Sequence, residues 1–112
     1  MQRIVINSDH GGFGLSPEAM RWIAERRGLP YTEERAGTSM VFPKVGGQYD
    51  MNLFPADKRN DLDLIGCVEA LGMKADGDYS SLRIVEIPDG VEWQIEEYDG
   101  REWVAEKHRT WS

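Results

Sequence analysis

A glycine-rich turn between a strand and a helix constrains this chain more than any other part of its sequence. Residues 4–6 are apolar at successive positions, which is typical of a strand that is buried on both faces. Residues 10–14, His-Gly-Gly-Phe-Gly, follow soon after and form what we call the glycine loop. Glycine allows positive φ angles and lets another group approach the backbone closely. Ser16 then predicts a helix N-cap and Pro17 the first helical position, so the sequence predicts a strand, a tight turn and a helix.

Two interpretations of the glycine loop remain open at this level. At the start of a helix, free N–H groups and a partial positive charge suit a phosphate or a carboxylate. A strand-to-helix turn can also require glycine only because the turn is tight. The loop matches neither the Walker pattern nor G-x-G-x-x-G, so it predicts no standard nucleotide-binding motif.

Length and composition predict one soluble domain. A chain of 112 residues can bury one modest core, and its 40% hydrophobic and 29% charged residues are ordinary for a globular protein. No apolar run approaches the roughly 18 residues of a membrane span, and the N-terminus does not resemble a signal peptide. Cys67 is the only cysteine, so no disulfide can form within the chain. We therefore expect a cytoplasmic protein that has no membrane partner.

The net charge of −7 is concentrated in the second half of the chain. Residues 1–60 carry eight Lys and Arg against seven Asp and Glu, whereas residues 61–112 carry five against thirteen. Contacts with nucleic-acid phosphates depend on Lys and Arg, so this balance argues against a DNA or RNA partner. The acidic half is explained either by solubility or by mimicry of a nucleic acid.

Two helices are predicted from apolar periodicity and capping residues. The first covers residues 17–27 and ends at Gly28. Asn60 predicts the N-cap of the second helix, whose apolar residues recur at helical spacing. The buried stripe of that helix consists of Leu64, Ile65, Val68 and Leu71. Residues 29–59 carry little periodicity, so we expect an irregular excursion whose aromatic side chains pack on the domain or on a second subunit.

The last third of the chain changes to the period-two pattern of β-strands. Residues 82–87 predict one strand, and Asp99-Gly100 predicts the two-residue turn of a hairpin. Pairing about this turn sets Tyr98 opposite Arg101, and it sets Ile95 opposite Val104 on an apolar face. The predicted fold class is therefore α+β. We expect a small single domain over residues 1–112, in which an antiparallel sheet containing the C-terminal hairpin packs against two helices.

The sequence contains no set of residues that predicts catalysis or metal binding. His10 and His108 are far apart along the chain and Cys67 has no cysteine partner, so no zinc cluster is indicated. Cys67 lies beside the apolar stripe of the second helix, which predicts a buried thiol rather than a nucleophile. Asp9 beside His10 is the one suggestive acid–base pair. We therefore expect a protein that is not an enzyme and that uses no cofactor.

The sequence does offer a binding site made of two distant parts. The glycine loop provides backbone donors and an aromatic ring for stacking. The C-terminal strand end provides basic and aromatic side chains, which suit a phosphate and a base. An alternative for this tail is a basic terminus that only offsets the local acidity. The candidate ligand-binding residues are His10, Gly11, Gly12, Phe13, Gly14, Lys107, Arg109 and Trp111.

Several segments of the chain resemble a family of small phage-encoded proteins with similar ends and a variable middle. These segments are the strand–GGFGLS–helix unit, residues 84–93 (IVEIPDGVEW), residues 98–100 (YDG) and residues 106–111 (EKHRTW). The family is similar to the Thoeris anti-defence sponge proteins. The resemblance covers residues 3–28 and 60–111 and leaves residues 29–59 outside it.

The resemblance implies a function in immune evasion. Thoeris sponge proteins bind glyco-cyclic ADP-ribose signals made by bacterial TIR enzymes, and some also hold cyclic oligonucleotides. It further implies a homodimer or an assembly of dimers in the cytoplasm of an infected bacterium, with Arg109 as a phosphate or base contact. The family pattern has an aromatic residue before the Gly-Gly pair, where this chain has His10, so the imidazole would have to take the place of that ring.

Two other functions stay open. The acidic second half could block a basic surface of a nucleic-acid-binding host protein. A hydrolase of a cyclic nucleotide could use His10 or His108 as its acid–base group.

Overall fold

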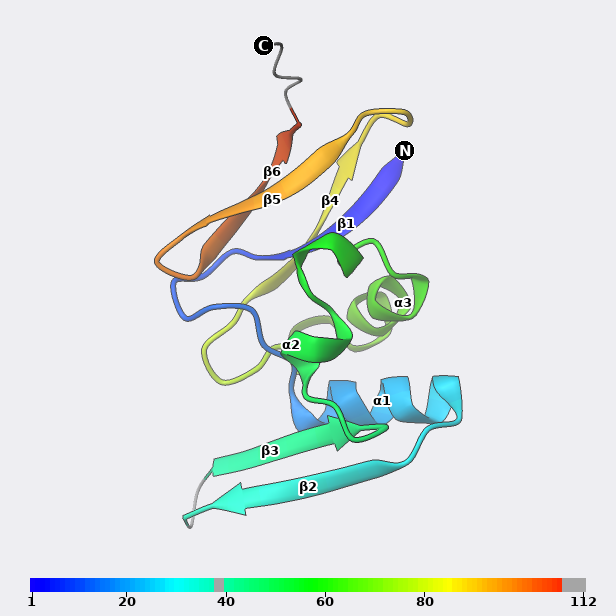
Figure 1. The fold of residues 1–112 in the computed structure, drawn as a ribbon, viewed down its shortest axis with the longest axis vertical. Coiled ribbons are helices and arrows are strands. Elements are labelled where there is room, and N and C mark those ends of the chain that lie inside the picture. The colour runs from blue at the N-terminus through cyan, green and yellow to red at the C-terminus, as the bar shows by residue number, and fades with distance from the viewer. Residues whose placement is uncertain (38–39, 108–112) are drawn as a thin grey trace, which may run out of the picture.

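The chain forms an α+β fold built from short elements, as the sequence predicts (Figure 1). The computed structural model describes residues 1–37 and 40–107. In chain order the elements are β1 (Gln2–Asn7), α1 (Pro17–Arg27), β2 (Tyr31–Ala36), β3 (Met40–Val45), α2 (Asp50–Leu53), the 3-10 turn η1 (Ala56–Lys58), α3 (Leu62–Leu71), the 3-10 turn η2 (Gly72–Ala75), β4 (Leu82–Ile87), β5 (Trp93–Tyr98) and β6 (Arg101–Glu106). The described strands pair in three antiparallel sheets of two strands each, β1–β4, β2–β3 and β5–β6.

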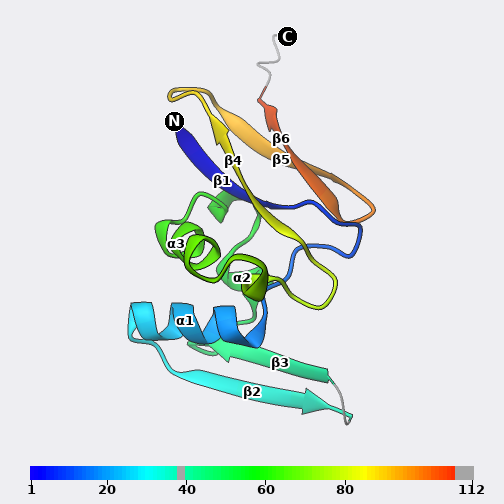
Figure 2. The same cartoon turned by 180° about the vertical axis from the view of Figure 1, so that it is seen from behind.

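The three sheets and the two longer helices are arranged along one long axis of the molecule. Figures 1 and 2 show β5–β6 and β1–β4 at one end, α3 and α1 in the middle, and β2–β3 at the other end. The core cluster joins Val5 of β1 to the buried faces of both helices, and Phe54 and Val45 extend it toward β3. The helices therefore separate the two ends of the molecule and supply most of its core.

Helix α1 begins and ends where its capping residues predict. Ser16 Oγ accepts a hydrogen bond from Ala19 N at 3.0 Å, and Pro17 follows the cap. Gly28 ends the helix in the left-handed region, with φ of 64°.

Helix α3 begins one residue later than predicted. The N-cap is Asp61 and not Asn60, because the Asp61 carboxylate accepts hydrogen bonds from Asp63 N and Leu64 N. A carboxylate at this position also interacts favourably with the positive end of the helix. Leu64, Ile65 and Val68 are buried on the predicted stripe.

The expectation of an irregular excursion over residues 29–59 is wrong. This segment forms the hairpin β2–β3, the short helix α2 and the turn η1. The sequence of this hairpin does not show the alternation of apolar residues that predicts a strand, because much of the hairpin faces solvent. Glu33, Glu34 and Arg35 are exposed in succession, and Pro43 lies on an edge strand. The segment is nevertheless anchored in the core, since Phe54 is fully buried.

The C-terminal hairpin has the predicted register. Ile95 lies opposite Val104, and Tyr98 lies opposite Arg101 across the Asp99-Gly100 turn. The face of β6 that carries Val104 also carries Glu102, which is 9% exposed and pairs with the buried Arg59 at 2.6 Å. This buried ion pair, which the sequence does not predict, fastens the hairpin to the rest of the molecule.

Candidate functional site

The glycine loop is held in place by the buried side chain of Asn7 at the end of β1. Its Nδ2 donates to the carbonyl oxygens of Asp9 and Gly100, at 2.7 and 2.8 Å. Its Oδ1 accepts from Ser81 N at 2.9 Å and from Asp9 N at 3.2 Å. One fully buried amide therefore joins the loop to the start of β4 and to the β5–β6 turn.

Close backbone packing explains one glycine of the loop and one glycine that packs against it. A Cβ atom on Gly11 would lie 1.9 Å from the carbonyl oxygen of Tyr79. A Cβ atom on Gly100 would lie 2.4 Å from the carbonyl oxygen of His10. Such distances are far below van der Waals contact, so these two positions require glycine. Gly11 is therefore explained by the close approach of the Tyr79 backbone, from a segment distant in the sequence.

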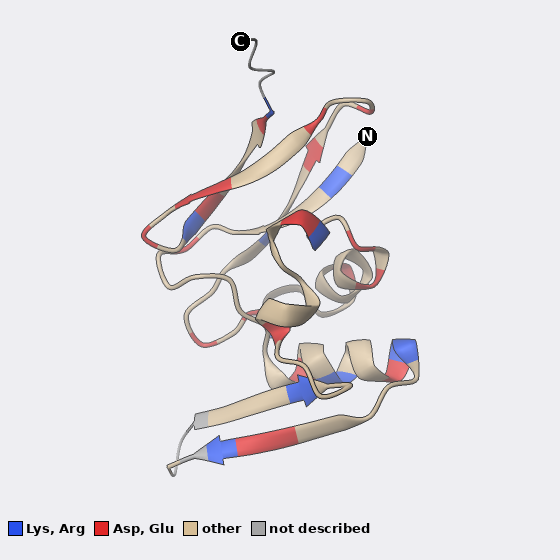
Figure 3. Ribbon diagram, viewed as in Figure 1, with Lys and Arg blue, Asp and Glu red and all other residues tan. Residues whose placement is uncertain are grey.

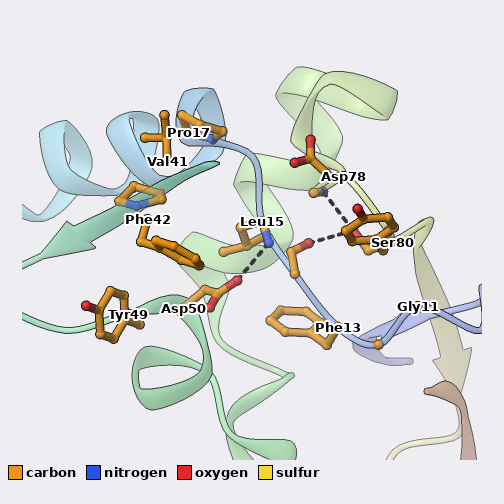
Figure 4. Close-up of a pocket in the computed structure, with 15 residues that line it drawn as sticks. Gly11, Phe13, Leu15, Pro17, Val41, Phe42, Tyr49, Asp50, Asp78 and Ser80 are labelled. Atoms are coloured by element: carbon orange, nitrogen blue, oxygen red, sulfur yellow. Dashed lines mark hydrogen bonds between the residues drawn. The ribbon is translucent and has the colours of Figure 1, made fainter. Parts of the chain in front are cut away.

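The expected phosphate cradle is not supported, because the chain places its own carboxylate beside the loop. Asp50 Oδ2 accepts a hydrogen bond from Leu15 N at 2.9 Å, where an anion was expected (Figure 4). The burial of Phe13 likewise gives no support to its expected stacking role. Its side chain is 9% exposed, and the Arg59 guanidinium carbon lies 3.7 Å from the centre of its ring. Gly11, Gly12, Phe13 and Gly14 instead line a pocket of about 420 Å³ shared with β3, α2 and residues 77–80.

The basic tail and the glycine loop do not meet within one chain. Lys107 N donates to Glu92 O at 2.9 Å, at the end of the β5–β6 hairpin opposite the turn that touches the loop. The six residues of β6 separate these two ends by about 20 Å at the usual rise per residue. A site made from Lys107 and the glycine loop of the same chain is therefore wrong. Arg109 and Trp111 lie outside the described residues.

A different group of residues forms a cleft on the other side of the glycine loop. This hollow, which we call the cationic cleft, has a volume of about 460 Å³. It lies between the ends of β1 and β4 and the turn end of the β5–β6 hairpin, and His10 brings the glycine loop into its wall. Its lining residues are Ile6, Ser8, His10, Arg83, Tyr98, Arg101, Glu102 and Trp103.

The cleft carries two guanidinium groups whose charge is not neutralised by an ion pair. Neither Arg83 nor Arg101 forms an ion pair or a side-chain hydrogen bond with another residue of the described ranges 1–37 and 40–107. Among the described residues that line the cleft, Glu102 is the one carboxylate, and its two oxygens are bound by Arg59. Among the described lining residues, the two arginines therefore carry charge that no lining carboxylate is free to neutralise, although the hairpin around the cleft is acidic (Figure 3).

Two exposed aromatic side chains complete the cleft. Tyr98 is 75% exposed and Trp103 is 43% exposed. The Trp103 indole N–H donates to Glu96 Oε2 at 3.1 Å, which orients the ring. An Arg plane or an aromatic ring can stack on a base, and a guanidinium can bind a phosphate through two parallel N–H bonds.

Of the predicted site residues, the structure places only His10 in the cationic cleft. His10 Nδ1 lies 3.9 Å from Asp99 Oδ2 on the β5–β6 turn. Sequence reasoning missed Arg83, Tyr98, Arg101 and Trp103, although part of the signal was present. The hairpin register already set Tyr98 opposite Arg101, but nothing in the sequence showed that β4 would bring Arg83 to the same place.

The remaining chemistry-bearing residue behaves as a structural group. Cys67 is fully buried, as predicted, and burial raises the pKa of its thiol to about 12. Among the residues that the structure describes, no three His, Cys, Asp or Glu side chains are grouped so that they could hold a metal ion. In the same residues, no helix has the length and apolar character required to cross a membrane.

Comparison with protein-family models, with curated proteins and with solved structures gives no match for this chain.

Proposed function

We propose that this protein binds a small cyclic nucleotide and sequesters it without cleaving it, as the resemblance to the Thoeris sponge proteins implies. Glyco-cyclic ADP-ribose and cyclic oligonucleotides are the candidate ligands. The observation that carries the proposal is the cationic cleft, where Arg83 and Arg101 lie beside Tyr98 and Trp103 and have no carboxylate partner within residues 1–37 and 40–107. An anion that also carries a flat base matches this combination of groups.

The dimensions of the cleft suit such a ligand. A volume of about 460 Å³ falls within the range of roughly 300–1,000 Å³ that is typical of small-molecule sites. Its lining combines the buried side chain of Ile6, which is 6% exposed, with aromatic and polar side chains. A lining of apolar and aromatic side chains with a few polar groups is common in ligand sites.

Each guanidinium has a defined part in the proposal. Arg83 approaches from β4 and Arg101 from β6, so a ligand with two phosphates can contact one arginine with each. One charge-assisted hydrogen bond contributes about 1.5–3 kcal/mol, so the loss of either arginine should weaken binding roughly 10- to 100-fold. The tail residue Arg109, from the same chain or a second subunit, remains a further phosphate contact in this proposal.

Isothermal titration calorimetry with cyclic ADP-ribose isomers and cyclic dinucleotides tests the proposal. We expect one of these ligands to bind with a dissociation constant below about 10 μM, and Arg83→Ala and Arg101→Ala to weaken that binding. The matched control is Arg35→Ala, because Arg35 is exposed on β2 and also lacks an ion pair within the described residues. Absence of binding by every ligand, or an equal loss of affinity in the control, would refute the proposal.

A second candidate function follows from the acidic surface of the C-terminal hairpin. Glu96, Glu97 and Glu106 are exposed on β5 and β6, and Figure 3 shows acidic segments along much of this hairpin. Such a surface could cover a basic region of a nucleic-acid-binding host protein. A complex of this kind must weaken steeply with ionic strength, so co-purification at low and high salt distinguishes it from the sponge. A partner that stays bound at high salt argues against charge mimicry.

A further inference from the structure

A second hollow, separate from the cationic cleft, has the opposite chemical character. We call it the aromatic pocket, and it has a volume of about 420 Å³ (Figure 4). Its walls come from residues 11–15, from β3, from the start of α2 and from residues 77–80. Ser8 and His10 line the cleft, whereas residues 11–15 line the pocket. This segment of the chain therefore runs between the two hollows.

The charge that faces the aromatic pocket is negative. Asp50 and Asp78 are the ionisable carboxylates among its lining residues, and no Lys, Arg or His from the described part of the chain lines it. Asp50 is fixed in place, because its Oδ2 accepts from Leu15 N at 2.9 Å and its Oδ1 from Met51 N at 2.8 Å. Asp78 is exposed, and Figure 4 shows it across the pocket from the Phe42 and Tyr49 side.

Two cations that lie against aromatic rings of the pocket lining are neutralised by other carboxylates. Lys44 Nζ lies 4.7 Å from the centre of the Tyr49 ring, but it is bound to Glu34 at 2.6 Å. Arg59 lies against the Phe13 ring, but it is bound to Glu102 at 2.6 Å. Neither cation is therefore available to balance the charge of Asp50 and Asp78.

Two aromatic rings form a corner in this pocket. The rings of Phe42 and Tyr49 are nearly perpendicular, at 82°, with their centres 6.5 Å apart. The Tyr49 hydroxyl donates to Glu34 at 2.6 Å, which fixes the orientation of the ring. Phe42 is 38% exposed, so part of its ring remains open to a ligand. The face of an aromatic ring attracts a cation, and two rings set at an angle can contact one rounded cation from two sides.

We infer that the aromatic pocket binds a small organic ammonium group. The cation lies in the corner between Phe42 and Tyr49, and the carboxylates of Asp50 and Asp78 balance its charge. This site goes beyond the proposed nucleotide function, because it shares no lining residue with the cationic cleft and selects a ligand of opposite charge.

The test compares choline with its neutral isostere 3,3-dimethyl-1-butanol, by following amide chemical shifts of the intact protein in NMR titrations. The two probes have nearly the same shape, so a difference in affinity reports the charge. We expect choline to bind at least roughly tenfold more tightly than the alcohol, with shifts at Gly12 and Gly14. Equal affinities, or no shift with choline up to about 50 mM, would overturn the inference.

Two variants and two controls locate the binding site. Asp78→Asn removes one negative charge from an exposed side chain and should weaken choline binding several-fold, whereas Asp57→Asn, on the exposed turn η1, should not. Phe42→Leu keeps an apolar side chain but removes the ring, so it should also weaken choline binding. Unchanged affinity in both Asp78→Asn and Phe42→Leu contradicts the inference. Arg83→Ala should leave choline binding unchanged, which separates this result from the outcome for the nucleotide.

Discussion

The buried ion pair between Arg59 and Glu102 should control the stability of the whole molecule. Arg59 is 2% exposed, and its guanidinium binds both Glu102 oxygens, at 2.6 and 3.0 Å. Glu102 also accepts from Asn7 N at 2.8 Å, and Arg59 Nε donates to Phe54 O at 2.9 Å. The pair therefore joins β6, β1 and the segment before α3.

The expected loss of stability follows from the removal of one partner of the Arg59–Glu102 pair. Glu102→Ala leaves a buried guanidinium without its counter-charge and Asn7 N without its acceptor. Breaking a buried pair in this way typically costs about 3–5 kcal/mol. Domains of this size have free energies of unfolding of about 5–15 kcal/mol, so the variant should lose a large part of its stability. Because β6 also carries Arg101 and Trp103, the cationic cleft should be disturbed with it.

The assay is urea denaturation followed by tryptophan fluorescence. Glu69→Ala is the control, because it removes a carboxylate from the exposed Arg3–Glu69 pair and should leave the midpoint nearly unchanged. The double variant Arg59→Met/Glu102→Leu removes both buried charges, and it should be more stable than Glu102→Ala alone. The reasoning is refuted if Glu102→Ala behaves like Glu69→Ala, or if the double variant is less stable than Glu102→Ala.

Three further predictions follow from the packing of the core and the loop. Gly11→Ala should lower the free energy of unfolding by about 1–3 kcal/mol, because the new Cβ atom would meet the backbone of Tyr79. Gly14→Ala should lower it less, because the nearest atom to its Cβ would lie at 3.7 Å. Thermal melts compare the two variants, and equal melting temperatures would contradict this argument. Asn7→Ala should destabilise the fold by more than about 2 kcal/mol, since four hydrogen bonds are lost, and a denaturation midpoint close to that of the native chain would disprove this. Burial raises the pKa of the Cys67 thiol from 9.0 to about 12, so the folded state favours the protonated thiol. The contribution of this thiol to the free energy of unfolding should therefore be present below pH 9 and disappear as the pH rises toward 12. Iodoacetamide should therefore alkylate native Cys67 far more slowly than the unfolded chain at pH 8, because the thiol is fully buried and protonated, and similar rates would contradict a buried thiol.

Local signals in the sequence predict local structure well in this chain. Ser16, Pro17 and Gly28 define α1, and Asp99-Gly100 sets the register of the C-terminal hairpin, because each of these signals acts within a few residues. The β2–β3 hairpin was missed because only part of it is buried, so its strands show no clear alternation of apolar residues. Among the side chains of the hairpin that the structure describes, Val45 is the one that is fully buried, and it lies at the end of a strand that contains Pro43.

The candidate site depends on contacts between distant residues, which one sequence does not reveal. In the sequence, nothing distinguishes Arg83 and Arg101 from other charged residues of predicted strands. Only the packing of β4 near the β5–β6 turn places them around one cleft. Phe13 was expected to face a ligand because it stands among glycines. Its burial depends on Arg59, a residue far away in the sequence that lay in the segment expected to be irregular.

Identification of the molecule that the protein binds is the most direct test of the proposed function. The purified protein is incubated with a lysate in which a TIR enzyme is active, washed, and denatured by heat, and the released material is analysed by liquid chromatography and mass spectrometry. The account predicts that the native chain releases an intact cyclic nucleotide and that Arg101→Ala releases much less. Release of a linear product would indicate cleavage, and release of no nucleotide by the native chain would contradict the sponge function itself.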